Sequence, residues 1–275
     1  MTRVLTQSGV LLMLSLALLN TASTAIAAPS AERWSFWEPS DEASERIVDH
    51  GAWQALLDCR VETLADDRTI IHYGDFTPDD RAKLTGYLTT ITALDPRTLN
   101  RREQFAYWIN LYNALTVDLM LNNLEKESIL RVGGGFLPTG PWDDRITRVA
   151  NQWLTLNDIE HRILRPIFKD QRIHYAVNCA SIGCPNLSPT AYTSENLETL
   201  LDEGERLYLN HPRGLALVDG KLTLSSIFKW YRGDFGASEE ALLAYLASVR
   251  TDLADELSGY DRRIRYAYGW ERNDH

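Results

Sequence analysis

Two cysteines and a histidine lie close together in the sequence HYAVNCASIGCPNL, which spans residues 174–187. The apolar run over 173–177 predicts a short buried strand, and the loop after it carries Cys179 and Cys184. A strand end is rigid and a loop is accessible, so their junction can display a reactive side chain. Cys179 is therefore a candidate nucleophile, provided that a neighbouring cation or aligned N–H groups stabilise its thiolate.

The cysteine pair has three interpretations. Cys179 and Cys184 can form a disulfide that pins the loop, because four residues separate them, and Cys59 is then left as a free thiol. Alternatively, Cys179 is a catalytic thiolate that works with a histidine. A metal site made of His174 and both cysteines fits poorly, because this spacing matches no common zinc pattern. We therefore expect no metal and no cofactor, and the first two interpretations stay open.

The histidine partner of Cys179 is not fixed by the sequence. On an extended strand, His174 lies on the opposite face from Cys179 and roughly 16 Å away, at ~3.3 Å per residue. His174 can act as the base only if the chain turns sharply between the two residues. His72, His161 and His211 are other candidates, but no local pattern brings them to the loop.

A long helix is predicted over residues 100–123, and its apolar side chains cover most of its circumference. Glu103, Asn110 and Asn113 fall close together on the remaining strip. If that strip is buried, these polar side chains need hydrogen-bond partners. They would then either brace a loop backbone or line a pocket, where they could orient the imidazole of a catalytic histidine or polarise an oxyanion.

The segment SIFKWYRGDF, residues 226–235, combines aromatic rings with charged groups. Trp230, Tyr231 and Asp234 belong to it, and they could bind a sugar or a peptide together with Trp142. The same residues are also typical of a packed helix end that carries an Arg–Asp pair. Under the binding interpretation, Ser181 and Cys184 belong to a rigid loop that forms one wall of the groove.

The elements that must position these residues are mainly helices. Helices are predicted at residues 44–59, 77–94, 100–123, 156–166, 194–209, 226–235 and 238–249, and strands at 70–73, 146–156, 173–177, 215–218, 222–224 and 264–270. Strands and helices do not alternate regularly, and no long linker divides the chain. We predict a single α+β domain, mostly helical with a few short strands.

The first residues have the pattern of a signal peptide. Arg3 precedes an apolar run over 10–19, and Ala25-Ile26-Ala27 matches an A-x-A cleavage site. We predict a signal peptide at 1–27, an N-terminal arm and first helix at 28–60, and one globular domain at 61–275 with its core at about 80–270. The protein would then be periplasmic or secreted, with no stable membrane insertion after cleavage.

The overall charge argues against nucleic acid as a partner. The 275-residue chain has a formal net charge of −10, so it gains no long-range attraction to a phosphate backbone.

Four sequence blocks resemble a known family. YWINLYNALTV (107–117), DIEHRILRP (158–166), HYAVNCASIGCPNL (174–187) and SIFKWYRGDF (226–235) occur in this order and resemble the domain of unknown function 547 family, found in secreted bacterial proteins and in plant proteins. The resemblance runs over roughly residues 80–270, except that Tyr268-Gly269-Trp270 replaces a more acidic pattern, which puts the last strand in doubt.

The resemblance implies that the recurring positions share one site, although it implies no activity. These positions are Glu103, Trp108, Asn110, Tyr112, Asn113, Glu160, Arg165, His174, Cys179, Ser181, Cys184, Pro185, Trp230 and Asp234.

Two functions of different classes follow from these residues. The first is a periplasmic thiol-dependent hydrolase or acyl transferase that uses Cys179, with His174, Glu103, Asn110 and Asn113 as candidate catalytic residues. The second is a non-catalytic module that binds an envelope peptide or glycan beside a loop pinned by a Cys179–Cys184 disulfide. An envelope peptide or glycan is the expected partner in both.

Overall fold

The computed structural model describes residues 29–133 and 139–274, so the predicted signal peptide lies outside the described residues. Its helices are α1 (Gly51–Arg60), α2 (Pro78–Ala93), α3 (Arg101–Leu121), a π-helix (Asp158–Phe168), α4 (Ile173–Ala176), α5 (Leu197–Asn210), α6 (Ile227–Trp230), α7 (Glu239–Val249) and α8 (Ala254–Ser258). The strands are short, and the predicted α+β class with a mostly helical content is confirmed.

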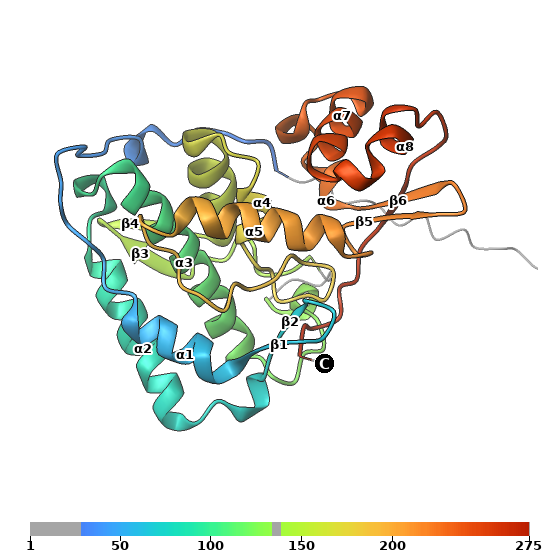
Figure 1. The fold of residues 1–275 in the computed structure, drawn as a ribbon. Helices are drawn as coiled ribbons and strands as arrows, with labels where there is room; N and C mark the ends of the chain where they lie inside the picture. The colour runs from blue at the N-terminus through green and yellow to red at the C-terminus, as the bar shows by residue number, and fades with distance from the viewer. Residues whose placement is uncertain (1–28, 134–138, 275) are drawn as a thin grey trace, which may run out of the picture.

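Helix α3 is the centre of the larger hydrophobic core. The Asn100 side chain caps its first turn by accepting a hydrogen bond from the Glu103 N–H. Nearly every side chain from Glu103 to Val117 is buried, because α2, the π-helix and the cysteine loop contact different sides of the helix. Figure 1 shows α1 and α2 on the left of the molecule, where α1 packs against α2 and α2 packs against α3.

Local signals explain where α2 begins. The Thr77 side chain accepts a hydrogen bond from the Asp80 N–H, and the Asp80 carboxylate accepts one from the Thr77 N–H. Pro78 follows the cap, where its missing N–H costs nothing. The helix ends before Asp95-Pro96, as the sequence predicts.

In the part of the chain that the structure describes, seven strands form three small sheets. β1 (Val61–Thr63) pairs with β2 (Thr69–Ile71), β3 (Thr147–Val149) with β4 (Gln152–Leu154), and β5 (Leu215–Val218) with β6 (Lys221–Ser225), all antiparallel, while β7 (Arg265–Ala267) lies parallel to β6. Asp219 and Gly220 both have positive φ at the β5–β6 turn, as a two-residue hairpin requires. This sheet and helices α6, α7 and α8 form a second hydrophobic cluster.

The structure corrects four elements of the prediction. Residues 173–177, predicted as a strand, instead form the single-turn helix α4, because a short apolar run buried on all sides suits a helix as well as a strand. The predicted helix at 44–59 begins only at Gly51, and the one at 194–209 begins at Leu197. The helix at 156–166 is present, but it has the rare π form.

A C-terminal segment (268–273) packs against the loop that carries Cys179 and Cys184 (residues 178–185), which we call the cysteine loop. The Gly183 N–H donates to the Gly269 carbonyl, and the Ile182 N–H donates to the Glu271 carbonyl. A Cβ atom on Gly183 would meet the backbone N and O of Gly269 at 2.7 Å, so only glycine permits this approach. The predicted strand at 264–270 is therefore shorter than expected, and the chain beyond it pairs with a loop.

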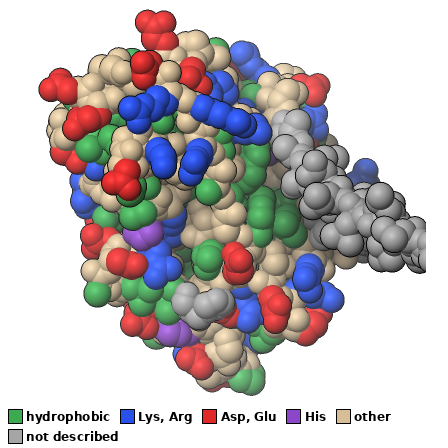
Figure 2. Space-filling view, turned by 90° about the vertical axis from the view of Figure 1, so that its right-hand side faces the viewer, with side chains coloured by type: hydrophobic (Ala, Val, Ile, Leu, Met, Phe, Trp, Pro, Cys, Tyr) green, Lys and Arg blue, Asp and Glu red, His purple; other side chains and the backbone are tan. Residues whose placement is uncertain are grey.

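Figure 2 shows hydrophobic side chains near the middle of one face, between side chains of both charges. Among the described residues, no helix combines the length and the apolar character that a membrane span requires.

The first prediction tests the docking of the C-terminal segment. Gly183→Ala should lower the free energy of unfolding by about 1–3 kcal/mol, because the added methyl group forces two backbones apart. Urea denaturation measures the change. Gly74→Ala is the control, because a Cβ there meets nothing within 4 Å. Equal stability of the two variants would contradict the close approach.

Candidate active site

The cysteine loop (178–185) is anchored to helix α3 by one buried side chain. The Asn113 side chain donates to the Ala176 carbonyl at 2.9 Å and accepts from the Asn178 N–H at 2.8 Å. These two bonds satisfy buried backbone groups on both sides of residue 177 and fix the point at which the chain leaves α4. The structure thus brings Asn113 to the cysteine loop, where it braces the backbone.

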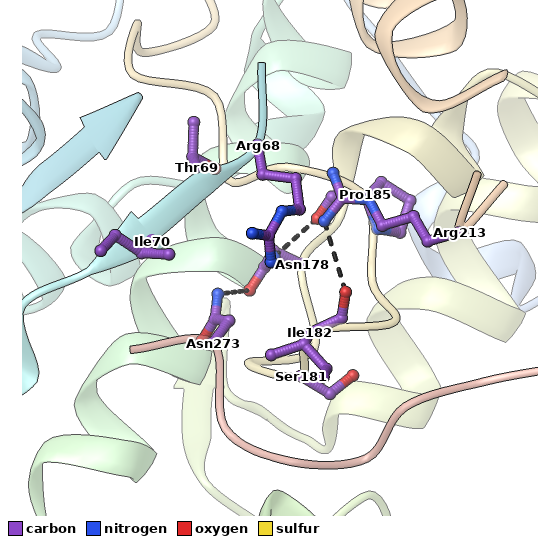
Figure 3. A pocket seen from close by; sticks show the side chains of 9 residues that line it. All are labelled: Arg68, Thr69, Ile70, Asn178, Ser181, Ile182, Pro185, Arg213 and Asn273. Atoms are coloured by element: carbon purple, nitrogen blue, oxygen red, sulfur yellow. Dashed lines mark hydrogen bonds between the residues drawn. The ribbon is translucent and has the colours of Figure 1, made fainter. Parts of the chain in front are cut away.

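The loop is closed internally by Asn178. Its side chain donates to the Pro185 carbonyl at 2.7 Å and accepts from the Ala180 N–H at 2.8 Å. Ala180 has φ of 59°, a left-handed conformation that costs energy for alanine and is held here by these bonds. Figure 3 shows Asn273 directed at Asn178, and Arg213 lies on the other side, with its guanidinium donating to the Ile182 carbonyl.

The Cys179 sulfur lies among hydrogen-bond donors. Its Sγ is 3.1 Å from the Ser181 Oγ, 3.0 Å from the Tyr268 hydroxyl and 2.6 Å from the Cys184 Sγ. The Ser181 and Tyr268 hydroxyls are themselves 3.2 Å apart. Cys179 is partly exposed, whereas Cys184 is only 4% exposed and accepts a hydrogen bond from the Cys179 N–H.

These surroundings give the two thiols opposite acidities. Burial opposes ionisation of Cys179, but hydrogen bonds from Cys184, Ser181 and Tyr268 outweigh it and hold the pKa of the Cys179 thiol below its ordinary value. Burial and the adjacent Cys179 sulfur raise the pKa of Cys184 well above its ordinary value. The more accessible of the two sulfurs is thus the one that carries a negative charge more readily.

An acid–base cluster lies next to the cysteine loop. The His174 Nε2 is 2.7 Å from Asp234 Oδ2, and Arg165 binds both oxygens of the same carboxylate at 2.6 and 3.1 Å. Tyr231 stacks on the His174 ring with the centroids 4.2 Å apart. Burial opposes ionisation of Asp234, yet His174 and Arg165 hold the pKa of this carboxyl well below its usual range.

Glu160 lies between this cluster and the cysteine loop. Its Oε2 accepts a hydrogen bond from the Tyr112 hydroxyl at 3.1 Å, and its Oε1 is 3.8 Å from the Nδ1 atoms of both His161 and His174. Its charge also opposes ionisation of Cys179. The π-helix supplies Glu160, His161 and Arg165 together, in keeping with the frequent occurrence of π-helical turns at functional sites.

The three side chains of the predicted polar strip on α3, Glu103, Asn110 and Asn113, bind three different segments of the chain. Asn110 donates to the Tyr192 carbonyl and accepts from the Tyr192 N–H, so it braces the chain after the cysteine loop. Glu103 lies about 15 Å along the helix from Asn113 and accepts from the Val48 N–H at 2.7 Å. Glu103 and Asn110 are thus both hydrogen-bonded to backbone groups. Because they are separated along the helix, they bind different segments of the chain.

Glu103 also lies near a buried histidine. Burial lowers the pKa of His50 to about 4, although the Glu103 carboxylate acts in the opposite direction. His50 is bound to the Tyr87 hydroxyl through its Nδ1.

Aromatic rings extend from the sulfur cluster to the surface. Trp230, Tyr268 and Trp270 contact one another with ring centroids 4.7–5.5 Å apart, and all three are partly exposed. Trp142, which the sequence groups with Trp230, packs against the other hydrophobic core. The aromatic cluster of residues 230, 268 and 270 is thus the aromatic surface beside Cys179.

Sequence reasoning did not find Tyr268. Its hydroxyl reaches a sulfur 89 positions earlier in the chain, and no local spacing reports a contact over that distance. Glu160 was found only through the family resemblance. Within residues 29–133 and 139–274, no group of three or more His, Cys, Asp and Glu side chains is placed to hold a metal ion.

Comparison with known proteins gives one match. The model of a family described as "Protein of unknown function, DUF547" matches residues 96–209, which confirms the predicted resemblance there. This range includes α3, the π-helix and the cysteine loop, while the block at 226–235 and the C-terminal segment lie beyond it. Searches of curated proteins and of solved structures each found no match.

The second prediction concerns the Arg165–Asp234 pair. Asp234→Asn should lower the free energy of unfolding by about 2 kcal/mol at pH 7, because the Arg165 side chain is only 6% exposed and would lose its counter-charge. Asp252→Asn, at an aspartate whose side chain is 61% exposed, should change it by less than about 0.5 kcal/mol.

The same difference should depend on pH. The folded state lowers the pKa of Asp234 below its unfolded value of about 3.9, so the stabilisation is complete above about pH 5 and is lost as the pH falls below about 4. Urea denaturation between pH 3 and 7 measures the effect. A difference between wild type and Asp234→Asn that does not change over this range would contradict it.

Proposed function

We propose that this chain, which contains a DUF547 domain over residues 96–209, is a thiol-dependent acyl transferase or hydrolase whose nucleophile is Cys179. The observation that carries the proposal is the position of the Cys179 Sγ, in a partly exposed residue, among the Ser181 and Tyr268 hydroxyls and the Cys184 thiol. Hydrogen bonds from the Tyr268 hydroxyl and the Cys184 thiol, with the Ser181 hydroxyl bound to Tyr268 beside them, favour the thiolate, which is the nucleophilic form.

The same donors suit the next step of an acyl transfer. Attack of the Cys179 thiolate on a carbonyl carbon forms an S–C bond and moves the negative charge to the carbonyl oxygen. The Ser181 and Tyr268 hydroxyls then no longer bind a charged sulfur, and both can donate to that oxygen. Collapse of the intermediate expels the leaving group as an anion, which takes a proton from water, and leaves a thioester on Cys179. Water or a second acceptor then attacks the thioester carbonyl, gives up its proton to solvent, and releases Cys179 as a thiolate.

The proposal does not require a histidine bound to the sulfur. The His174 Nε2 is bound to Asp234, and its Nδ1 faces Glu160. Because hydrogen bonds already stabilise the thiolate, the proton need not be removed at the moment of attack. Glu160 then sets the charge next to the sulfur, and His174, whose Nδ1 faces Glu160, acts as a positioning residue.

The sequence suggests where this chemistry takes place. The signal-peptide pattern at residues 1–27 favours a periplasmic or secreted protein, so an envelope peptide or glycan is the proposed acyl donor or acceptor. The acidic chain favours neither nucleic acid nor another polyanion as a partner.

The third prediction tests the nucleophile directly. With p-nitrophenyl acetate at pH 7, the protein should release a burst of one nitrophenolate per chain and gain one acetyl group on Cys179. Tyr268→Phe should slow the burst about tenfold, because a hydrogen bond to a charged sulfur is lost. Stopped-flow absorbance and peptide mass spectrometry measure the two effects.

Variants assign that acetyl group. Cys179→Ala should abolish the burst, whereas Cys59→Ser should leave it unchanged, because Cys59 is an exposed residue of α1. A burst that survives in Cys179→Ala, or an acetyl group that maps to Cys59, would remove the basis for the proposal.

A second candidate function is the binding of an envelope glycan or peptide without catalysis. The observation that favours it is the aromatic cluster of residues 230, 268 and 270, because partly exposed rings in mutual contact offer a stacking surface for a sugar.

The fourth prediction separates the two functions. If binding is the function, Trp230→Ala should weaken the affinity for a soluble oligosaccharide of N-acetylated sugars about tenfold, and Cys179→Ser should leave it unchanged. Isothermal titration calorimetry measures both. Loss of affinity in Cys179→Ser with retention in Trp230→Ala would instead favour catalysis.

A further inference from the structure

We propose that Cys179 and Cys184 cycle between two thiols and one disulfide, so that this loop also carries out thiol–disulfide exchange with disulfide reactants. The proposal uses the same sulfur as the proposed acyl chemistry, but it does not depend on acyl transfer. It gives Cys184 a second role, because the proposed acyl chemistry uses this thiol only as a hydrogen-bond donor to Cys179.

The two sulfurs are already positioned for the bond. The Cys184 thiol points at the Cys179 Sγ from 2.6 Å, and the Cys179 N–H donates to the Cys184 Sγ at 2.8 Å. The turn between them is closed by the hydrogen bond from the Cys184 N–H to the Ser181 carbonyl. Bond formation therefore needs little rearrangement of a loop that is anchored on both sides.

The pair is asymmetric in the way that exchange requires. Cys179 is partly exposed and its pKa is lowered, so a disulfide in solution meets a reactive thiolate first. Cys184 is 4% exposed and its pKa is raised, so it stays protonated and out of reach until its neighbour has reacted. These are the properties of an attacking cysteine and a resolving cysteine.

The exchange balances with a disulfide RSSR as the oxidant. The Cys179 thiolate attacks one sulfur, an S–S bond forms between Cys179 and RS, the reactant S–S bond breaks, and the other half leaves as a thiolate. That thiolate takes the proton of Cys184. The Cys184 thiolate then attacks the Cys179 sulfur and expels the second half, which takes up the proton lost by Cys179. The net result is one internal disulfide and two molecules of RSH.

The surrounding hydroxyls make this disulfide reversible. Ser181 and Tyr268 stabilise the Cys179 thiolate, and that stabilisation is lost when its sulfur enters a disulfide. Stabilising the reduced form makes a disulfide easier to reduce. The oxidised loop has no free thiolate, so oxidation would also switch off acyl chemistry at Cys179.

The fifth prediction uses glutathione as the probe. In buffers of varied reduced-to-oxidised glutathione ratio, the wild-type protein should pass reversibly to one Cys179–Cys184 disulfide, while Cys59 remains open to a maleimide label. Cys184→Ser should stop at a glutathione adduct on Cys179. In Cys179→Ser, the buried Cys184 should react at least about tenfold more slowly. Peptide mass spectrometry after acid quenching measures each species.

Tyr268→Phe tests the reversibility. It should shift the glutathione equilibrium about tenfold towards the disulfide, because the reduced form loses a hydrogen bond to its thiolate. If the equilibrium is unchanged, the Tyr268 hydroxyl does not affect the stability of the Cys179–Cys184 disulfide, and the proposal is overturned. A wild-type protein that stops at the glutathione adduct, with Cys184 still a free thiol, would also overturn the proposal. This test does not depend on the folding of any variant.

The outcomes also separate this proposal from the acyl one. A reversible disulfide in a protein that never acquires an acetyl group at Cys179 would support exchange and refute acyl transfer. An acetyl group on Cys179 in a protein whose Cys184 never resolves the adduct would do the opposite.

Discussion

The hydrogen bonds that fix the backbone around residues 176–183 are the constraint on which the site depends. Asn113 holds the entry to the cysteine loop from inside the core, and the C-terminal segment holds its far side through the Gly183–Gly269 contact. A loop held on one side only could adopt other arrangements of its two sulfurs. Because it is held on both sides, the two cysteines keep fixed and unequal surroundings, and the left-handed conformation of Ala180 is tolerated.

The two carboxylates near the cysteine loop, those of Asp234 and Glu160, differ in how far neighbouring groups compensate their charge. Arg165 neutralises Asp234, and His174 is hydrogen-bonded to the same carboxylate, so Asp234 adds little net negative charge to the interior. The Glu160 carboxylate accepts from the Tyr112 hydroxyl and lies 3.8 Å from the His174 Nδ1, and its negative charge acts on Cys179. The acidity of Cys179 is therefore a balance between donors on the loop and C-terminal segment and a carboxylate on the π-helix.

Local sequence signals predict the parts of this fold that depend on neighbours in the chain. Thr77, Pro78 and Asp80 fix the start of α2, and Asp219-Gly220 fixes a hairpin turn, because each uses contacts within a few residues. The run over 173–177 was misassigned as a strand, since an apolar pattern of that length does not separate a buried helical turn from a strand.

The candidate site was predictable only in part, because several of its contacts join residues that are far apart in the sequence. The cysteine loop and the buried polar strip on α3 follow from residue types, and burial implies that the strip is hydrogen-bonded. The division of that strip among Val48, Tyr192 and the cysteine loop depends on tertiary packing. Tyr268 completes the sulfur cluster from the far end of the domain, so only the folded chain shows its role.

The long separation between the loop and the C-terminal segment gives the site an order of assembly. A growing chain is made from its N-terminus, and at about 5–20 residues per second the residues up to position 268 follow Cys179 only after several seconds. Until they dock, the sulfur lacks the hydroxyl that favours its ionised form. The hydrogen bond from the Tyr268 hydroxyl to the Cys179 sulfur can therefore form only after nearly the whole domain has been synthesised.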